Sequence, residues 1–388
     1  MQKKQLALLK ALLAQPTAPF REHHVIEFAT RVLRDGGVPF FADPVGNIVV
    51  GCNSRREYAR LVGTRTHEPL RLYVAHMDHP GFHGVRWRGP KRLHVQWHGG
   101  APVKHLAGAR VWLADDAGQT FEGRMRAATL AHRGRTIGKA EIVLDALPAV
   151  RPPAASLYGG FGFRAPVWQS GRLLYTKAAD DLVGVYAILV TALELARKRR
   201  GTQPPFLGLL TRAEEVGFVG AIGHFELGWL RTARRPVLCL SLETSRTLPG
   251  AVIGKGPVVR LGDRRTVFAP NAINVLTQLA QRELRGRHQR RIMDGGTCEA
   301  TAATVYGLTA FGISVPLGNY HNQGLEGGPD CRGKDGPAPE FVHLDDVDGM
   351  VTLCRALLRR GLPWEKPWHI ERRAYQKRLT EYRRLLAL

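Results

Sequence analysis

The stretch from Phe206 to Gly220 constrains the fold most, because an apolar run and an acidic turn follow each other there. Residues 206–211 are almost continuously apolar, which is typical of a strand buried on both faces of a parallel sheet. Glu214 and Glu215 come directly after this run. Ligands of open α/β sheets bind beyond the carboxyl ends of the strands. The Glu pair therefore stands where a site is expected, although a solvated acidic turn would show the same pattern.

Other candidate residues stand at comparable places. Apolar runs predict strands at 70–75, 236–242 and 308–315, and each is followed by side chains that bind metals. Asp180 and Asp181 precede a long apolar helix pattern, where they either cap the helix or project into a site. The candidate metal ligands from all these places are His76, Asp180, Glu215, Glu243 and His321.

These ligands are expected to gather along one edge of the sheet, where the carboxyl ends of parallel strands meet. Two histidines and three carboxylates suit two divalent metal ions with a bridging carboxylate. We expect two such ions per chain, with Zn favoured and Co or Mn as alternatives. Glu214 is then free to act as the general base. Asp78, two residues after His76, can orient that ligand from behind.

The element pattern predicts an α/β protein with a mostly parallel central sheet, interrupted by a small all-β domain. Residues 84–166 lack a helical period and contain short segments rich in Val, Trp and Thr, cut by glycines. The flanking segments, 1–83 and 167–363, are predicted to form one catalytic domain. Residues 364–388 are basic and predicted to be helical, and residues 53–69 are predicted to be a polar connection.

The net charge of +23 is unusual and could serve nucleic acid, an anionic surface or acidic substrates. The arginines are scattered, however, and no stretch interleaves basic and aromatic residues as an RNA-binding motif would, so nucleic acid is not favoured. Five distant cysteines without a C-x-x-C pair indicate a reducing compartment. The first residues make a poor secretion signal, and no segment is long and apolar enough to span a bilayer. We therefore expect a cytoplasmic protein without a membrane partner.

Several motifs resemble those of the dinuclear metallo-aminopeptidases of the tetrahedral, glutamyl-aminopeptidase type. They occur in the family's order between about residues 40 and 360. The matching segments are Ala75–Phe82, Lys177–Asp181, Glu214–Ala221, Gly254–Pro257, Gly295–Thr297 and the segment around His321. The resemblance implies a three-layer zinc-peptidase domain interrupted by a small β domain that packs between subunits. It also implies removal of N-terminal residues from peptides through a metal-bridging water and a Glu base.

The resemblance further implies two ligands for each metal and one bridge: His76 with Glu243, Glu215 with His321, and Asp180. It makes Glu214 the general base and Asp78 a catalytic residue that supports the metal ligands without binding metal itself. Asp181 matches the second, less demanding position of the family's Asp-Asp motif. Two departures, His79 in place of an acid and Cys298-Glu299 in place of an Asp after Gly-Gly-Thr, leave these ligands intact.

Two alternatives stay open. One is a related metal-dependent amidohydrolase or deacylase acting on a non-peptide substrate. The other is a basic, non-catalytic binding protein, which the complete set of ligands disfavours.

Overall fold

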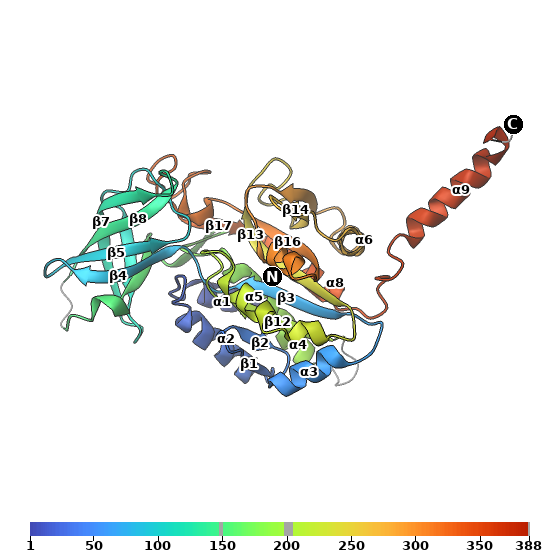
Figure 1. Ribbon diagram of the computed structural model, residues 1–388. Coiled ribbons are helices and arrows are strands. Elements are labelled where there is room, and N and C mark those ends of the chain that lie inside the picture. Colours follow the sequence, from blue (N-terminus) through green and yellow to red (C-terminus); the bar gives the residue numbers. More distant parts are fainter. Residues whose placement is uncertain (147–149, 198–204, 387–388) are drawn as a thin grey trace.

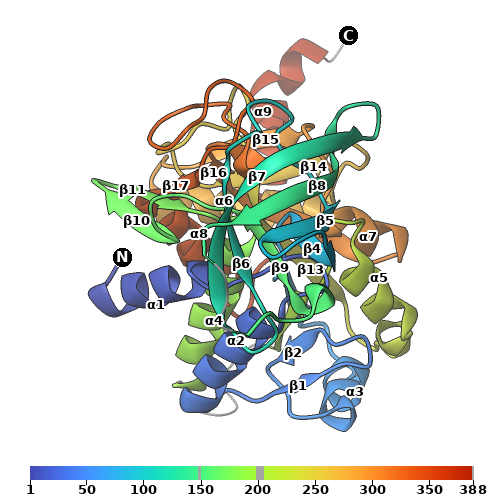
Figure 2. The same cartoon turned by 90° about the vertical axis from the view of Figure 1, so that its left-hand side faces the viewer.

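The computed structural model describes residues 1–146, 150–197 and 205–386, and the three omitted stretches fall within the predicted insertion, the catalytic domain and the basic tail. A large mixed sheet with helices packed against it lies beside a closed barrel (Figure 1). Figure 2 looks at the same molecule from the barrel side. The α/β class predicted from the sequence is confirmed.

The strand order of the large sheet is β1-β2-β12-β3-β13-β16-β14-β15. In that order, the bounds are Phe40–Ala42, Ile48–Val50, Phe206–Thr211, Leu70–His76, Val237–Arg246, Thr309–Leu317, Val258–Asp263 and Gln289–Met293. The central strands β12, β3, β13 and β16 are parallel, whereas β2 and β14 are antiparallel to their central neighbours. Every residue of β3 and β12 is buried, as expected for strands covered on both faces.

The barrel leaves the large sheet directly after β3. Its strands are β4 (Gly81–Trp87), β5 (Arg92–His98), β6 (Arg110–Ala114), β7 (Thr120–Ala131), β8 (Thr136–Leu144) and β9 (Tyr158–Phe161). They close in the order β4-β5-β8-β7-β6-β9. Burial alternates along β5 and, from Ala140 onward, along β8, so every second side chain there fills the interior, where Phe82, Trp97 and Phe161 pack together. The barrel thus has a hydrophobic core of its own.

The helices are α1 (Lys3–Leu13), α2 (His23–Asp35), α3 (Arg55–Gly63), α4 (Leu182–Ala196), α5 (Val219–Glu226), α6 (Pro270–Leu284), α7 (Glu299–Val305), α8 (Leu344–Leu357) and α9 (His369–Leu386). The almost wholly buried α4 packs on β3, β12 and β13, and α1, α2 and α8 pack on α4. A second sheet has the order β10 (Val167–Ser170), β11 (Leu173–Thr176) and β17 (Glu340–His343). Among the described residues, no helix combines the length and the apolarity that crossing a membrane requires.

Helix α3 lies where the sequence analysis places only a polar connection, so that prediction is wrong. The Ser54 side chain accepts a hydrogen bond from the backbone N–H of Glu57 (3.3 Å) and caps the helix. Tyr58 and Val62, four residues apart, are buried on the same face of the helix. The Ser-x-x-Glu spacing is a helix-start signal, which the polar composition of this stretch obscures.

A buried polar network ties the β1–β2 turn to the loop that carries the Glu pair. Asp43 accepts hydrogen bonds from the backbone N–H of Asn47 (2.9 Å) and from its side chain (2.8 Å), and contacts His224 Nδ1 on α5 (2.9 Å). Asn47 in turn bonds the backbone of Arg212 and Gly220, on either side of the Glu pair (3.2 and 3.0 Å). The turn between two short strands therefore holds the loop of the site.

We expect Asp43→Asn to lower the free energy of unfolding by about 2–3 kcal/mol, because an amide NH₂ would face donors that now bond a buried carboxylate. The measurement is chemical denaturation followed by far-UV circular dichroism. The matched control is Asp35→Asn at the exposed end of α2, which should change stability by about 0.5 kcal/mol or less. Equal stability of the two variants would contradict this role of the network.

Candidate active site

The register of the parallel strands brings the candidate ligands to one edge of the sheet. His76, the last residue of β3, is paired with Thr211, the last residue of β12. Val74 of β3 is paired with Ser241 of β13, so that His76 and Glu243 each lie two residues further along. Glu243 is inside β13, where the Ser241 hydroxyl donates to its Oε1 (2.8 Å).

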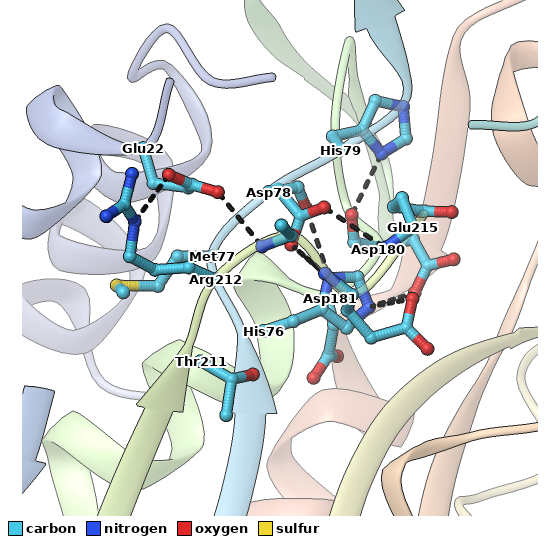
Figure 3. Close-up of polar contacts among 12 residues, drawn as sticks. Glu22, His76, Met77, Asp78, His79, Asp180, Asp181, Thr211, Arg212 and Glu215 are labelled. Atoms are coloured by element: carbon cyan, nitrogen blue, oxygen red, sulfur yellow. Dashed lines mark hydrogen bonds and ion pairs between the residues drawn. The ribbon is translucent and has the colours of Figure 1, made fainter. Parts of the chain in front are cut away.

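Asp78 connects the end of β3 to the Glu pair (Figure 3). Its Oδ1 accepts the backbone N–H of Glu214 (2.9 Å), and its Oδ2 accepts that of Glu215 (3.1 Å). The Asp78 carbonyl oxygen lies 3.1 Å from Nδ1 of His76, so a proton on Nδ1 leaves Nε2 facing the other candidate ligands. Asp78 therefore fixes His76 and both glutamates without pointing into the site itself.

The turn before the Glu pair is held from the opposite side by Glu22, the residue before α2. Its Oε1 accepts the backbone N–H of Ala213 (3.0 Å), and its Oε2 pairs with Arg212 Nε (2.8 Å). Ala213 has a positive φ of 51°, a backbone conformation that residues other than glycine rarely adopt. A buried carboxylate on each side thus holds a turn whose backbone is strained.

The side chains of Asp180 and Asp181 make different contacts, although the two residues are adjacent in the sequence. Asp181 accepts the backbone N–H of Gly184 (3.1 Å) and caps α4. Asp180 points to the edge of the sheet, where one carboxylate oxygen accepts from the hydroxyl of Thr244 (3.1 Å). The helix-cap interpretation is confirmed for Asp181, whereas Asp180 lies with the other candidate ligands and its role as a site residue stays a prediction.

His321 lies in the short turn Tyr320–Asn322 that follows β16, with a positive φ of 56°. Its backbone N–H donates to Oε1 of Glu340 on β17 (2.8 Å). The other oxygen of Glu340 accepts the backbone N–H groups of Ala179 (2.7 Å) and Asp180 (3.2 Å). One buried carboxylate thus holds the two loops that carry Asp180 and His321.

The barrel also touches His321. A Cβ built on Gly100, in the loop after β5, would lie 2.0 Å from Nδ1 of His321, so a side chain at position 100 would collide with the imidazole. Glycine is therefore needed here for close approach rather than for its backbone angles.

The candidate ligands form overlapping groups of donor atoms. Nε2 of His76 and Nε2 of His321 each lie 3.6 Å from a different carboxylate oxygen of Asp180. Glu215 Oε2 is 3.1 Å from His321 Nε2. Among the described residues, three groups have one donor atom from each member within 4.8 Å of the others: His76, Asp180 and Glu243; Asp180, Glu215 and His321; and His76, Glu214 and Glu215. The first two groups share Asp180 and together use every ligand predicted from the sequence.

These residues fit a pair of divalent cations. Among the described residues, Oε1 of Glu215 is buried without a hydrogen-bond partner, although buried polar atoms are nearly always bonded. Nε2 of His321 is also buried, and it faces Oε2 of Glu215 at 3.1 Å without forming a well-aligned hydrogen bond. Imidazole nitrogens and carboxylate oxygens are also the donors that zinc-class ions take when thiolates are absent. Both the chemistry of the set and its unpaired atoms therefore suit metal binding.

The electrostatics point the same way. Burial lowers the pKa of His76, but nearby carboxylates, Glu214 first, raise the pKa of His76 well above its usual range. For His321, burial is likewise outweighed by Glu215 and Asp180, which raise the pKa to about 10. Burial raises the pKa of Glu214, and neighbouring carboxylates raise it further. A concentration of negative charge that holds protons on two imidazoles would exchange those protons for cations.

The structure brings His76, Asp180, Glu214, Glu215, Glu243 and His321 together at one site, while their individual roles stay predictions. Sequence reasoning missed the residues that hold them: Glu340, Thr244, Ser241 and Glu22. It also left His79 without a role. His79 Nδ1 lies 2.8 Å from the carbonyl oxygen of Asp180, and burial lowers the pKa of this histidine to about 4, so it is a neutral donor to that loop.

The sequence profile of the M42 glutamyl aminopeptidase family matches residues 58–325. The chain belongs to this family. It is therefore a peptide-bond hydrolase, and the resemblance to the tetrahedral, glutamyl-aminopeptidase type is confirmed. A search of the curated proteins gives no match.

Solved structures of archaeal peptidases share the fold of this M42 chain. The aminopeptidase APDkam598 of Desulfurococcus kamchatkensis has a TM-score of 0.71 and 20% identity, over 93% of this chain and 96% of its own. The TET1 peptidase of Pyrococcus horikoshii, which can assemble into a tetrahedron or a large octahedral shell, has a TM-score of 0.70 and 19% identity, over 92% and 99%. The TET aminopeptidase of Thaumarchaeota archaeon SCGC AB-539-E09 has a TM-score of 0.71 and 18% identity, over 93% and 98%.

We expect Glu340→Gln to weaken metal binding about 10–100-fold, the usual cost of losing a partner that orients ligands. An amide at this position would turn one NH₂ group toward the backbone N–H groups that the carboxylate now accepts. Zinc affinity is measured by competition with a chromophoric chelator. The control is Glu122→Gln on the exposed surface of the barrel, and equal affinities for the two variants would refute this role of Glu340.

Proposed function

We propose that this M42 peptidase is a dinuclear metal-dependent aminopeptidase that hydrolyses the first peptide bond of its substrate. The observation that carries the proposal is the position of Asp180. Its two carboxylate oxygens each lie 3.6 Å from a different histidine, His76 on one side and His321 on the other. A carboxylate placed between two donor sets is the arrangement that a bridged metal pair requires.

His76 and Glu243 would hold one ion and Glu215 and His321 the other, with Asp180 between them. When bound, such ions polarise a substrate carbonyl and make water a better nucleophile. Zn is favoured by the donor set, and Co or Mn accept the same ligands. The fixed backbone of the Glu pair and the Thr244 hydrogen bond to Asp180 keep the carboxylates in place.

Glu214 is the residue left over when the two ligand groups are filled. Its Oε2 lies 3.8 Å from Nε2 of His76, so it faces the reaction site from beside the ligands. Its raised pKa, caused by burial and then by neighbouring carboxylates, suits a group that takes a proton from water and returns it to the leaving amine. Asp78 supports this role by fixing the Glu214 backbone.

We also propose that the chain forms a homo-oligomer in which the barrel contributes to the contacts between subunits and to substrate access. The Pyrococcus peptidase of the same fold forms closed shells. In this proposal, residues 1–83 and 167–363 form the catalytic domain, and residues 84–166 form the inserted domain.

The test of the function is a comparison of aminoacyl anilides with their N-acetylated forms. We expect hydrolysis only with a free α-amine, loss of activity after chelation, and full recovery at two divalent ions per chain, counted by elemental analysis of the dialysed protein. Hydrolysis of the N-acetylated forms alone would favour the deacylase instead. Full activity of the protein without bound metal would contradict both the aminopeptidase and the deacylase, because both proposals are metal-dependent.

Two conservative variants separate the base from its neighbouring ligand. Glu214→Gln should keep both ions and lose about 10²–10⁴-fold in kcat, the usual scale of a positioned acid–base group. Glu215→Gln should lose metal as well, because it removes a ligand oxygen. Metal content and kcat are measured on the same preparations. If Glu214→Gln also loses metal, Glu214 is a ligand in the third donor group, with His76 and Glu215.

A further inference from the structure

Helix α9 stands apart from the rest of the molecule and projects away from it (Figure 1). The segment just before it is fastened to α6: the side chains of Asn274 and Gln278 donate to the carbonyl oxygen of Pro367 (2.8 and 3.1 Å). Trp368 donates to Asn271 on the same helix (2.8 Å). Beyond that anchor, α9 has no buried residue over its described length. The helix is thus held firmly at one end and exposed everywhere else.

One face of α9 is apolar. Tyr375, Leu379, Tyr382 and Leu386 follow each other at spacings of four, three and four residues, which places them in one stripe along the helix. Their exposed fractions are 66%, 55%, 49% and 70%. Most of the stability of protein helices comes from packing of an amphipathic face, and an exposed stripe of large apolar side chains indicates a surface that something covers.

The rest of α9 is strongly basic. The helix contains six cationic and two acidic residues. The cationic ones are Arg372, Arg373, Lys377, Arg378, Arg383 and Arg384, and the acidic ones are Glu371 and Glu381. No ion pair joins these cations to another described residue. At 100° per residue, Arg372 and Arg383 border the apolar stripe on one side and Arg378, with Glu371, on the other. The remaining three cations lie on the opposite face of the helix. The partner of α9 therefore has to offer an apolar layer with negative charge along its edges.

These two properties argue against a parallel pair of α9 helices and against nucleic acid. A second copy of α9 in a parallel pair would place Arg378 against Arg383 of its neighbour, between chains that each carry +23. Nucleic acid would neutralise the arginines but would leave Leu379 and Leu386 without a partner. The bilayer interface meets both demands, because acidic headgroups lie directly above the acyl chains and because tyrosine and tryptophan favour that depth.

We propose that α9 binds flat to anionic lipid membranes, with its apolar stripe in the headgroup region and with Arg372, Arg378 and Arg383, which border the stripe, on acidic headgroups. The long arginine side chains beside the stripe can reach up to the headgroups while their methylene stems stay with the lipid. Each basic residue near an anionic surface contributes attraction that falls off within a Debye length. The protein would then be a peripheral membrane protein, in contrast to the expectation of no membrane partner, which considered spanning segments only.

The experiment measures binding of the full chain to vesicles of phosphatidylcholine with and without phosphatidylserine, by co-sedimentation. We expect binding only to the anionic vesicles and weakening with added salt. Leu379→Gln with Leu386→Gln keeps the charge and removes two of the four apolar side chains of the stripe, and should weaken binding at least about tenfold. The matched control replaces Val267 and Val305, exposed at 76% and 75% on the body, by Gln and should bind like the unchanged chain.

Three results would overturn the proposal. Equal binding of the stripe variant and the control would mean that charge alone attracts the protein. Retention of a fluorescent single-stranded DNA with no retention of anionic vesicles would assign the helix to nucleic acid. A smaller oligomer for the stripe variant in sedimentation, without any vesicles, would assign the stripe to a second copy of the chain. Thermal unfolding of both variants shows whether the body is intact, since α9 adds no buried contact to it.

Discussion

The parallel ladder of β12, β3 and β13 is the constraint on which the site depends. Hydrogen bonds between these strands fix their register, so His76 stands beside Thr211 and level with Glu243. Because the strands are buried on both faces, a slip of one residue would place the wrong side chains in two hydrophobic layers at once. The positions of these two candidate ligands are thus set by the packing of residues outside the candidate site.

The loops that supply the other residues have no such ladder, and buried carboxylates replace it. Asp78, Glu22 and Glu340 each accept backbone N–H groups from a neighbouring loop. A carboxylate can do this well, since its two oxygens accept several donors and its charge strengthens each bond. The cost is a high density of negative charge around the candidate ligands, which is also what makes the place attractive to cations.

The sequence predicts the strands, the Glu pair and the candidate ligands because these features are local: an apolar run ends and a polar residue follows. Glu340 could not be found this way. It touches Asp180 and His321 only because β17 pairs with β11 and approaches the end of β16, and neither contact leaves a signal in the residues around Glu340. The sequence also could not show which of Asp180 and Asp181 caps α4 and which lies among the candidate ligands, because the direction of each side chain depends on how α4 begins.

The close approach of Gly100 to His321 brings the barrel into direct contact with the candidate site. Any side chain at position 100 would occupy the space of the imidazole, so the loop after β5 lies directly against this candidate ligand. Tyr320 stacks on the same ring at 3.7 Å between centroids. A displacement of the barrel would therefore be transmitted to His321 directly. The barrel acts on the site as a positioning element, whatever contacts it makes with other subunits.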